Sequence, residues 1–305
     1  MEKYTAEAEL TGVALSYKNK SYIADKIFKS VPVSTSSFKY LIYDKSLNLQ
    51  LPETAIGSTG KPNEVDFGGE KRTESVKDNS LTVYIPKDAV EEAEKDGEDI
   101  FTRKTEFLTN IFDACREKRV ADLLQNEKNY GSNVKMLGKD EKFTSKDVNA
   151  FDIVDTAAAE VWFKPNIMIG SRKAINALRK NPAVVKAANH NDGDSGKASI
   201  QDLKEMFELD DVLVGESLVN TSKKGQVANY VGAWGNAIIL VYINRTADTS
   251  GGITFGFTAE KGKREVYKHF DEERGIKGVY GVKIAEQKTD IIVAPDCGYL
   301  IKNVY

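Results

Sequence analysis

The chain has 305 residues, of which 41% are hydrophobic and 29% charged, so it holds enough apolar material to bury a core. Its 43 basic and 46 acidic side chains alternate along the sequence, and this balance is not typical of a dedicated nucleic-acid binder. The longest apolar run, residues 237–243, is too short to cross a bilayer, and we expect no secretory signal in the first thirty residues. Two cysteines cannot form a disulfide framework or a four-cysteine zinc site, so a cytoplasmic site of synthesis fits best.

The first 85 residues predict an arm followed by a long hairpin. Residues 1–35 are polar apart from one apolar stretch at 22–33, which indicates a docking arm rather than a domain, with its docking place left open. Apolar residues alternate at 37–44 and 81–85, as in strands, and a polar excursion rich in glycine and charge separates them. Because an isolated two-stranded hairpin is marginally stable in water, this one requires cover that the rest of the chain does not offer.

A long helix follows. Residues 88–126 are dominated by helix formers with a break at Gly97, and from Glu98 onward they predict a helix of about 28 residues, or about 42 Å. Cys115 is expected on its apolar side as a small hydrophobe. A second helix is predicted over 145–161, with Thr144 or Ser145 as its cap.

The remainder predicts a compact mixed α/β domain and a late extended segment. Ser171 is expected to cap a helix that ends at Asn181 and Pro182. The other expected elements are a helix at 199–207 and strands at 165–170, 212–215, 237–243 and 253–258, followed by a long extended segment at 278–293 and the closing residues 298–301.

No motif in the chain points to catalysis or to a cofactor. The segment from Gly57 to Lys61 has two residues between its glycines where a phosphate-binding loop has four. The glycines at 251–256 precede a strand, which is the wrong context for a dinucleotide site. Neither His190 nor His269 lies in a nucleophile pattern. We therefore predict no catalytic residue, no cofactor and no metal.

Three polar features have simpler interpretations. His190 with Asp192 and Asp194 is better read as a solvated turn than as a metal site, although an enzyme using His190 and Asp192 stays an alternative. The basic residues at 261–268 are surrounded by acidic ones, so we expect a solvated face or a contact with another subunit. Long projecting elements without an active site favour a protein of an assembly.

The order of these elements resembles the major capsid proteins of tailed bacteriophages, which have the Hong Kong 97-type fold. Four sequences carry the resemblance, and together they span nearly the whole chain. They are YIADKIF at 22–28 with VPV at 31–33, KPNIMIG at 164–170 leading into AINAL at 174–178, VGAWGNAIIL at 231–240, and GYLIKN at 298–303.

The resemblance implies an α+β fold with four parts. These are an N-terminal arm at 1–35, an extended β-hairpin loop at 36–85 that lies over a neighbouring subunit, a peripheral domain with a long spine helix at 86–162 and 270–305, and an axial α/β domain at 163–269. On the extended loop, it implies inter-subunit contacts through Lys61, Glu64, Asp66, Phe67, Lys71 and Arg72.

The implied function is structural. Copies of the chain would assemble into the hexamers and pentamers of an icosahedral shell around double-stranded DNA, in the host cytoplasm and then in the virion. The implied partners are the chain itself, a portal protein, scaffold or decoration proteins, and packaged DNA through non-specific contact, with no membrane. An encapsulin-like nanocompartment around a cargo enzyme is the alternative.

Overall fold

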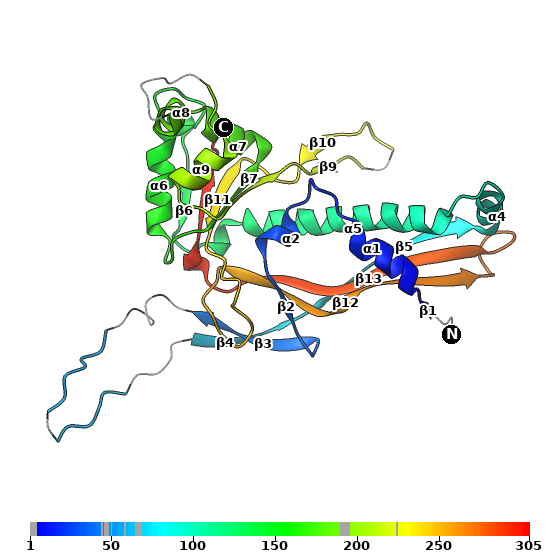
Figure 1. Ribbon diagram of the computed structural model, residues 1–305, viewed down its shortest axis with the longest axis horizontal. Coiled ribbons are helices and arrows are strands. Elements are labelled where there is room, and N and C mark those ends of the chain that lie inside the picture. Colours follow the sequence, from blue (N-terminus) through cyan, green and yellow to red (C-terminus); the bar gives the residue numbers. More distant parts are fainter. Residues whose placement is uncertain are drawn as a thin grey trace.

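The computed structural model describes residues 5–43, 45, 49, 51–57, 59–64, 69–189, 196–223 and 225–305 (Figure 1). Two sheets organise this part of the chain, a long one and a compact one, and two ribbons project from them. The long sheet contains β1 (Thr5–Ala6), β2 (Ser30–Pro32), β5 (Lys77–Pro86), β12 (Gly256–Asp271) and β13 (Val279–Ile292). The compact sheet contains β6 (Val134–Met136), β7 (Ile167–Ser171), β8 (Asp211–Gly215), β11 (Ala237–Val241) and β14 (Gly298–Lys302). The ribbons are β3 (Ser37–Tyr43) with β4 (Gly69–Ser75), and β9 (Leu218–Asn220) with β10 (Tyr230–Gly232).

The long sheet corrects two expectations. The strand predicted at 81–85 lies within β5, but β5 pairs with β13, and the ribbon strand β3 pairs with β4 instead. The strand predicted at 253–258 continues to Asp271 as β12, so the whole basic cluster at 261–268 lies on a strand rather than on a wholly solvated face. Arg264 and Val266 are buried while Lys263 and Glu265 are exposed, and this alternation explains how a charged segment forms a strand.

The predicted long helix is confirmed as α5 (Ile100–Leu124), preceded by α4 (Lys87–Lys95). Asp99 caps α5 by accepting a hydrogen bond from the Thr102 amide at 3.0 Å. The expectation for Cys115 is wrong, because this residue is exposed. Its place on the buried face is taken by Arg116 and Glu117.

The arm packs along α5 and the long sheet, as Figure 1 shows. Its helices are α1 (Ala8–Ser16) and α2 (Ala24–Ile27). Helix α1 contacts both α5 and β12, and β2 runs parallel to β12 from Ser30 to Pro32. The arm therefore docks on its own chain along this stretch.

The compact sheet has the order β6-β14-β11-β7-β8, and four helices cover one of its faces. They are α6 (Ala150–Glu160), α7 (Arg172–Lys180), α8 (Pro182–Asn189) and α9 (Ile200–Met206). Ser171 caps α7 as predicted, its hydroxyl accepting from the Ala174 amide at 3.2 Å. The cap of α6 is Asn149 rather than Thr144 or Ser145. Helix α8 was not expected, because Pro182 begins a new helix where it was read only as a stop.

Three short 3₁₀ helices complete the described elements, at Glu127–Asn129, Lys139–Glu141 and Pro295–Cys297. The predicted domain boundary between residues 269 and 270 falls inside β12. The predicted late extended segment forms β13 in the long sheet, whereas β14, from the same predicted domain, lies in the compact sheet beside β11. No helix in the described part of the chain is both long enough and apolar enough to span a bilayer.

Candidate functional site

The predicted contact residues lie on the ribbon β3–β4 and the loop beyond it. Lys61, Glu64 and Lys71 are exposed, and Arg72 is exposed with an ion pair to Glu70 at 3.0 Å. Asp66 and Phe67 lie outside the described residues. The four that are described are not gathered into one site, since they are spread along the loop and β4.

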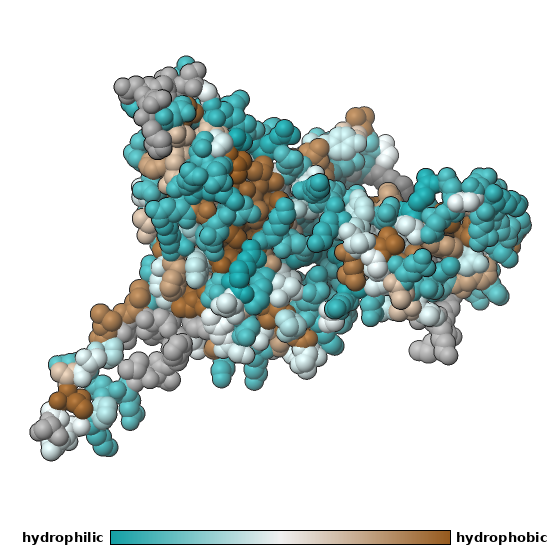
Figure 2. Space-filling model, in the orientation of Figure 1, coloured by the Kyte–Doolittle hydropathy of each residue, from teal (hydrophilic) through white to brown (hydrophobic). Residues whose placement is uncertain are grey.

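The same loop also exposes apolar side chains. Leu51 is 95% exposed and Ile56 is 52% exposed, and Figure 2 shows hydrophobic residues on this projection, away from the body of the molecule. These side chains expose apolar surface to water. A contact with another molecule would bury that surface and gain about 25 cal/mol of free energy per Å² buried. The loop is therefore suited to lie against a second surface.

A second candidate site is the junction where the arm crosses α5, which we call the arm–spine junction. At its centre is Glu117, a fully buried carboxylate on α5. It accepts hydrogen bonds from the Ile23 amide at 3.0 Å, the Ala24 amide at 2.8 Å and the Trp234 indole Nε1 at 2.7 Å. One side chain thus joins the arm, α5 and the segment between β10 and β11.

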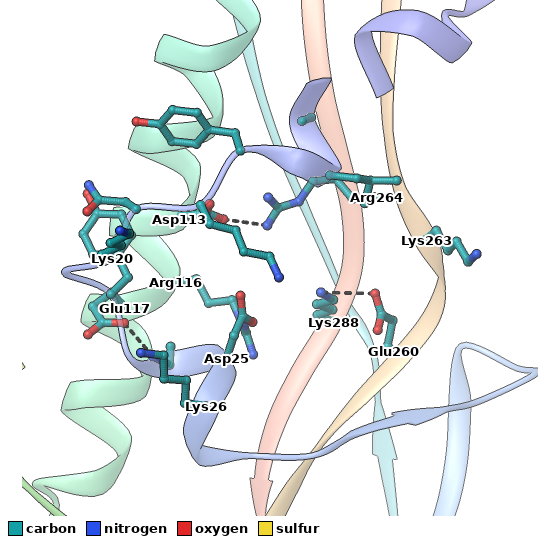
Figure 3. Close-up of a pocket in the computed structure, with 17 residues that line it drawn as sticks. Lys20, Asp25, Lys26, Asp113, Arg116, Glu117, Glu260, Lys263, Arg264 and Lys288 are labelled. Carbon is teal, nitrogen blue, oxygen red and sulfur yellow. Dashed lines mark hydrogen bonds and ion pairs between the residues drawn. The ribbon is translucent and has the colours of Figure 1, made fainter. Parts of the chain in front are cut away.

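Buried and half-buried ion pairs extend the junction toward the long sheet. Arg264 on β12 donates to Asp113 at 2.7 Å and to Glu286 at 3.0 Å, and Lys288 lies 3.1 Å from Glu260 (Figure 3). Burial raises the pKa of Asp113, although the Arg264 guanidinium opposes that shift. These pairs link α5 to β12 and β13.

A third pairing connects the arm to the same sheet. Arg116, which follows Asp113 by three positions on α5, bonds to Asp25 of the arm and lies 3.4 Å from Asp290 on β13. Tyr22 donates to the Asn110 side chain at 3.2 Å, and its pKa is raised by burial and then by the Asp113 carboxylate. A cavity of about 430 Å³ remains between the arm, α5 and β12.

This arrangement is suited to holding segments together rather than to chemistry. Its acids are matched by arginine and lysine or by amide donors, and the junction contains no histidine, cysteine or serine among its lining residues in the described chain. No group of three or more potential metal ligands occurs among the described residues. His190 and Asp192, on which the enzyme alternative depends, lie outside that part of the structure. Cys297 is buried, and burial raises its pKa to about 12, so it is not a reactive thiol at neutral pH.

The junction was not predicted from the sequence, although one signal was present. Arg116 stands four residues from Phe112 and from Val120, and all three are buried. A charged residue on the apolar repeat of a long helix indicates a buried ion pair, since an unpaired charge is costly there.

Comparisons with known proteins show what the chain is similar to. No family model matches it. It is 32% identical over 301 residues to the major capsid protein of Pseudomonas phage JBD67, covering 98% of this chain and 97% of that protein. Among solved structures, a phage-related protein from Bordetella bronchiseptica matches 99% of each chain with a TM-score of 0.76 and 21% identity. The capsid of cyanophage P-SCSP1u matches 99% of this chain and 92% of the other, with a TM-score of 0.60 and 12% identity.

Proposed function

Because the chain belongs to the family of major capsid proteins of tailed phages, we propose that its copies build the hexamers and pentamers of the virion shell around double-stranded DNA. The family and its Hong Kong 97-type fold are as predicted, and the protein is a structural, non-enzymatic component of the icosahedral capsid. The observation that carries the proposal is the match to a phage capsid protein over 98% of the chain.

This proposal assigns a structural role to each part of the chain. We assign the arm to residues 1–35, the extended loop to the β3–β4 part of 36–85, the peripheral domain to the long-sheet part of 86–162 and 270–305, and the axial domain to 163–269 together with β6, α6 and β14, which belong to the compact sheet and its helix layer. The peripheral role of α5 is supported by its packing on the long sheet, and the axial role by the helix-covered compact sheet. Portal, scaffold or decoration proteins and packaged DNA are proposed as further partners.

The extended loop is proposed to lie on a neighbouring subunit through Lys61, Glu64, Asp66, Phe67, Lys71 and Arg72. The exposure of Leu51 and Ile56 supports this role, because a second copy would bury them. Exposed ion pairs are worth only about 0–1 kcal/mol each, so shell stability would come from repetition of weak contacts in closed rings.

The test is electron microscopy and light scattering of the concentrated protein. Closed polyhedral particles or capsomer rings are expected, and a subunit that stays monomeric under every assembly condition would refute the proposal. The nanocompartment alternative is tested by analysing the contents of particles purified from cells. A nanocompartment should contain a copurified enzyme, whereas a phage shell should contain DNA.

The loop contacts need a separate variant. Replacing Lys71 and Arg72 by glutamate should reduce particle yield, whereas the same charge change at the exposed Lys95 and Lys128 should leave it unchanged. Equal yields from the two variants would count against the loop assignment while leaving the shell itself untouched.

A further inference from the structure

A basic pocket lies on the compact domain, away from the arm–spine junction. It has a volume of about 700 Å³, and its charged side chains in the described chain are Lys146, Lys173 and Lys180. Phe143 and Pro182 contribute apolar wall. We call this feature the lysine pocket.

Among the described residues, the lysine pocket has three positive side chains and no acidic side chain in its lining. Lys173 and Lys180 lie two turns apart on α7, about 10.5 Å along the helix axis. All three lysines are exposed, and within the described residues none of them has an ion-pair partner. The Tyr305 main-chain oxygen at the pocket already accepts from Lys142 at 3.1 Å and from Asn236 at 2.6 Å.

A fourth lysine beside the pocket is repelled by neighbouring positive charges. The pKa of Lys197, next to the pocket residue Gly196, is lowered by burial and then by repulsion from Arg179, Lys180 and Arg172. Mutual repulsion of this kind costs free energy in the isolated subunit, and an anionic partner would relieve it.

A matching acidic surface exists on the same domain. Helix α6 exposes Asp152, Asp155 and Glu160 and contains no basic residue. These carboxylates extend over eight positions, or about 12 Å of helix, which is close to the 10.5 Å between Lys173 and Lys180. Between them lie the small exposed side chains of Thr156 and Ala159, which allow close approach of a second surface.

The two surfaces are distinct, although the pocket borders the start of α6, because Phe143, Thr144 and Lys146 line it together with residues of α7. Helix α6 contacts β14, whereas α7 contacts β7, β8 and β11 on the other half of the sheet, and α8 contacts both helices. Figure 1 shows α6 on the left flank and α7 toward the right. A ring of identical copies requires two different surfaces on each copy, since each copy offers one to each neighbour.

We propose that the lysine pocket of one copy receives the acidic face of α6 from the next copy in the ring. The proposal rests on the proposed shell function and names the pair of surfaces that join neighbouring compact domains. A second copy is the favoured occupant because the complementary charge, at a similar spacing, is present on the chain itself.

Charge exchange tests the contact. Lys173→Glu with Lys180→Glu should raise the critical concentration for particle assembly about tenfold, through lost attraction and new repulsion at each contact. Asp152→Lys with Asp155→Lys should do the same, and the variant with all four changes should return to within about threefold of the parent. Lys95→Glu with Lys128→Glu serves as the control for net charge.

The readouts are sedimentation and electron microscopy, with circular dichroism and thermal unfolding to verify that each variant is folded. A four-change variant as defective as either pair overturns the contact. Normal particles from Lys173→Glu with Lys180→Glu that retain less DNA also overturn it, and would assign the pocket to nucleic acid. Absence of particles from the parent protein would instead count against the shell function itself.

Discussion

Glu117→Ala is the change that should damage the arm–spine junction most. In the native structure its carboxylate is fully buried and accepts from the amides of Ile23 and Ala24 and from the indole of Trp234. Alanine removes the acceptor for all three donors. The arm and the segment between β10 and β11 would then lose their shared attachment to α5.

The magnitude follows from two opposing effects. Three buried donors left without a partner cost about 1–3 kcal/mol each, or about 3–9 kcal/mol together. Removing the buried carboxylate eliminates its desolvation cost of several kcal/mol. In addition, the amides of Ile23 and Ala24 can form hydrogen bonds with water if the arm separates from α5. We therefore expect a net loss of about 2–5 kcal/mol in the free energy of unfolding.

The assay is urea unfolding of the unassembled subunit, followed by tryptophan fluorescence. The chain has two tryptophans, so a Trp162→Phe background makes Trp234 the reporter. The emission of Trp234 in the folded Glu117→Ala variant should shift to longer wavelength as the indole loses its buried partner. The matched control is Glu106→Ala, an exposed glutamate on the same helix.

A difference of less than about 0.5 kcal/mol between the two variants would refute the reasoning, because surface substitutions commonly fall in that range. Glu117→Gln provides a graded comparison. Glutamine keeps one carbonyl acceptor of similar shape, so it should lose less stability than alanine.

Three further outcomes are expected. Gly215→Ala would place its Cβ 2.1 Å from the Trp234 ring and should lower stability by about 1–3 kcal/mol in thermal unfolding, whereas Gly12→Ala, with open space around it, should not. Arg264→Ala should cost about 3–5 kcal/mol by the same measurement, because Glu286 is left buried and, among the described residues, keeps Lys288 at 3.7 Å as its one cationic partner. An aromatic disulfide reagent should modify only Cys115 in the native protein at pH 8, because Cys115 is exposed and Cys297 is buried. Since burial raises the pKa of Cys297 from 9.0 to about 12, the stability that its neutral thiol contributes should be complete below pH 9 and lost between pH 9 and 12. Cys297→Ala should abolish that pH-dependent loss.

Local chemistry explains which elements could be predicted. The cap at Ser171 and the α5 periodicity depend on residues within a few positions of each other, so the sequence carries the whole signal. In contrast, β5 pairs with β13, which lies near the other end of the chain. Nothing in the alternation of residues 81–85 indicates that β5 should pair with β13 rather than with β3. Pairing of remote strands is a global property, and an alternating pattern specifies a face but not a neighbour.

The arm–spine junction was missed for a related reason. Charged residues on a long helix ordinarily face solvent, and Arg116 and Glu117 become buried only because the arm and Trp234 arrive from remote parts of the chain. A single apolar stripe on α5 would have bound the arm without selecting its position. Directional donors and acceptors do select it, because the carboxylate of Glu117 is satisfied only when Ile23, Ala24 and Trp234 all reach their places. The charges on α5 therefore contribute the positional specificity with which the arm is held, while the apolar residues around them supply most of the burial.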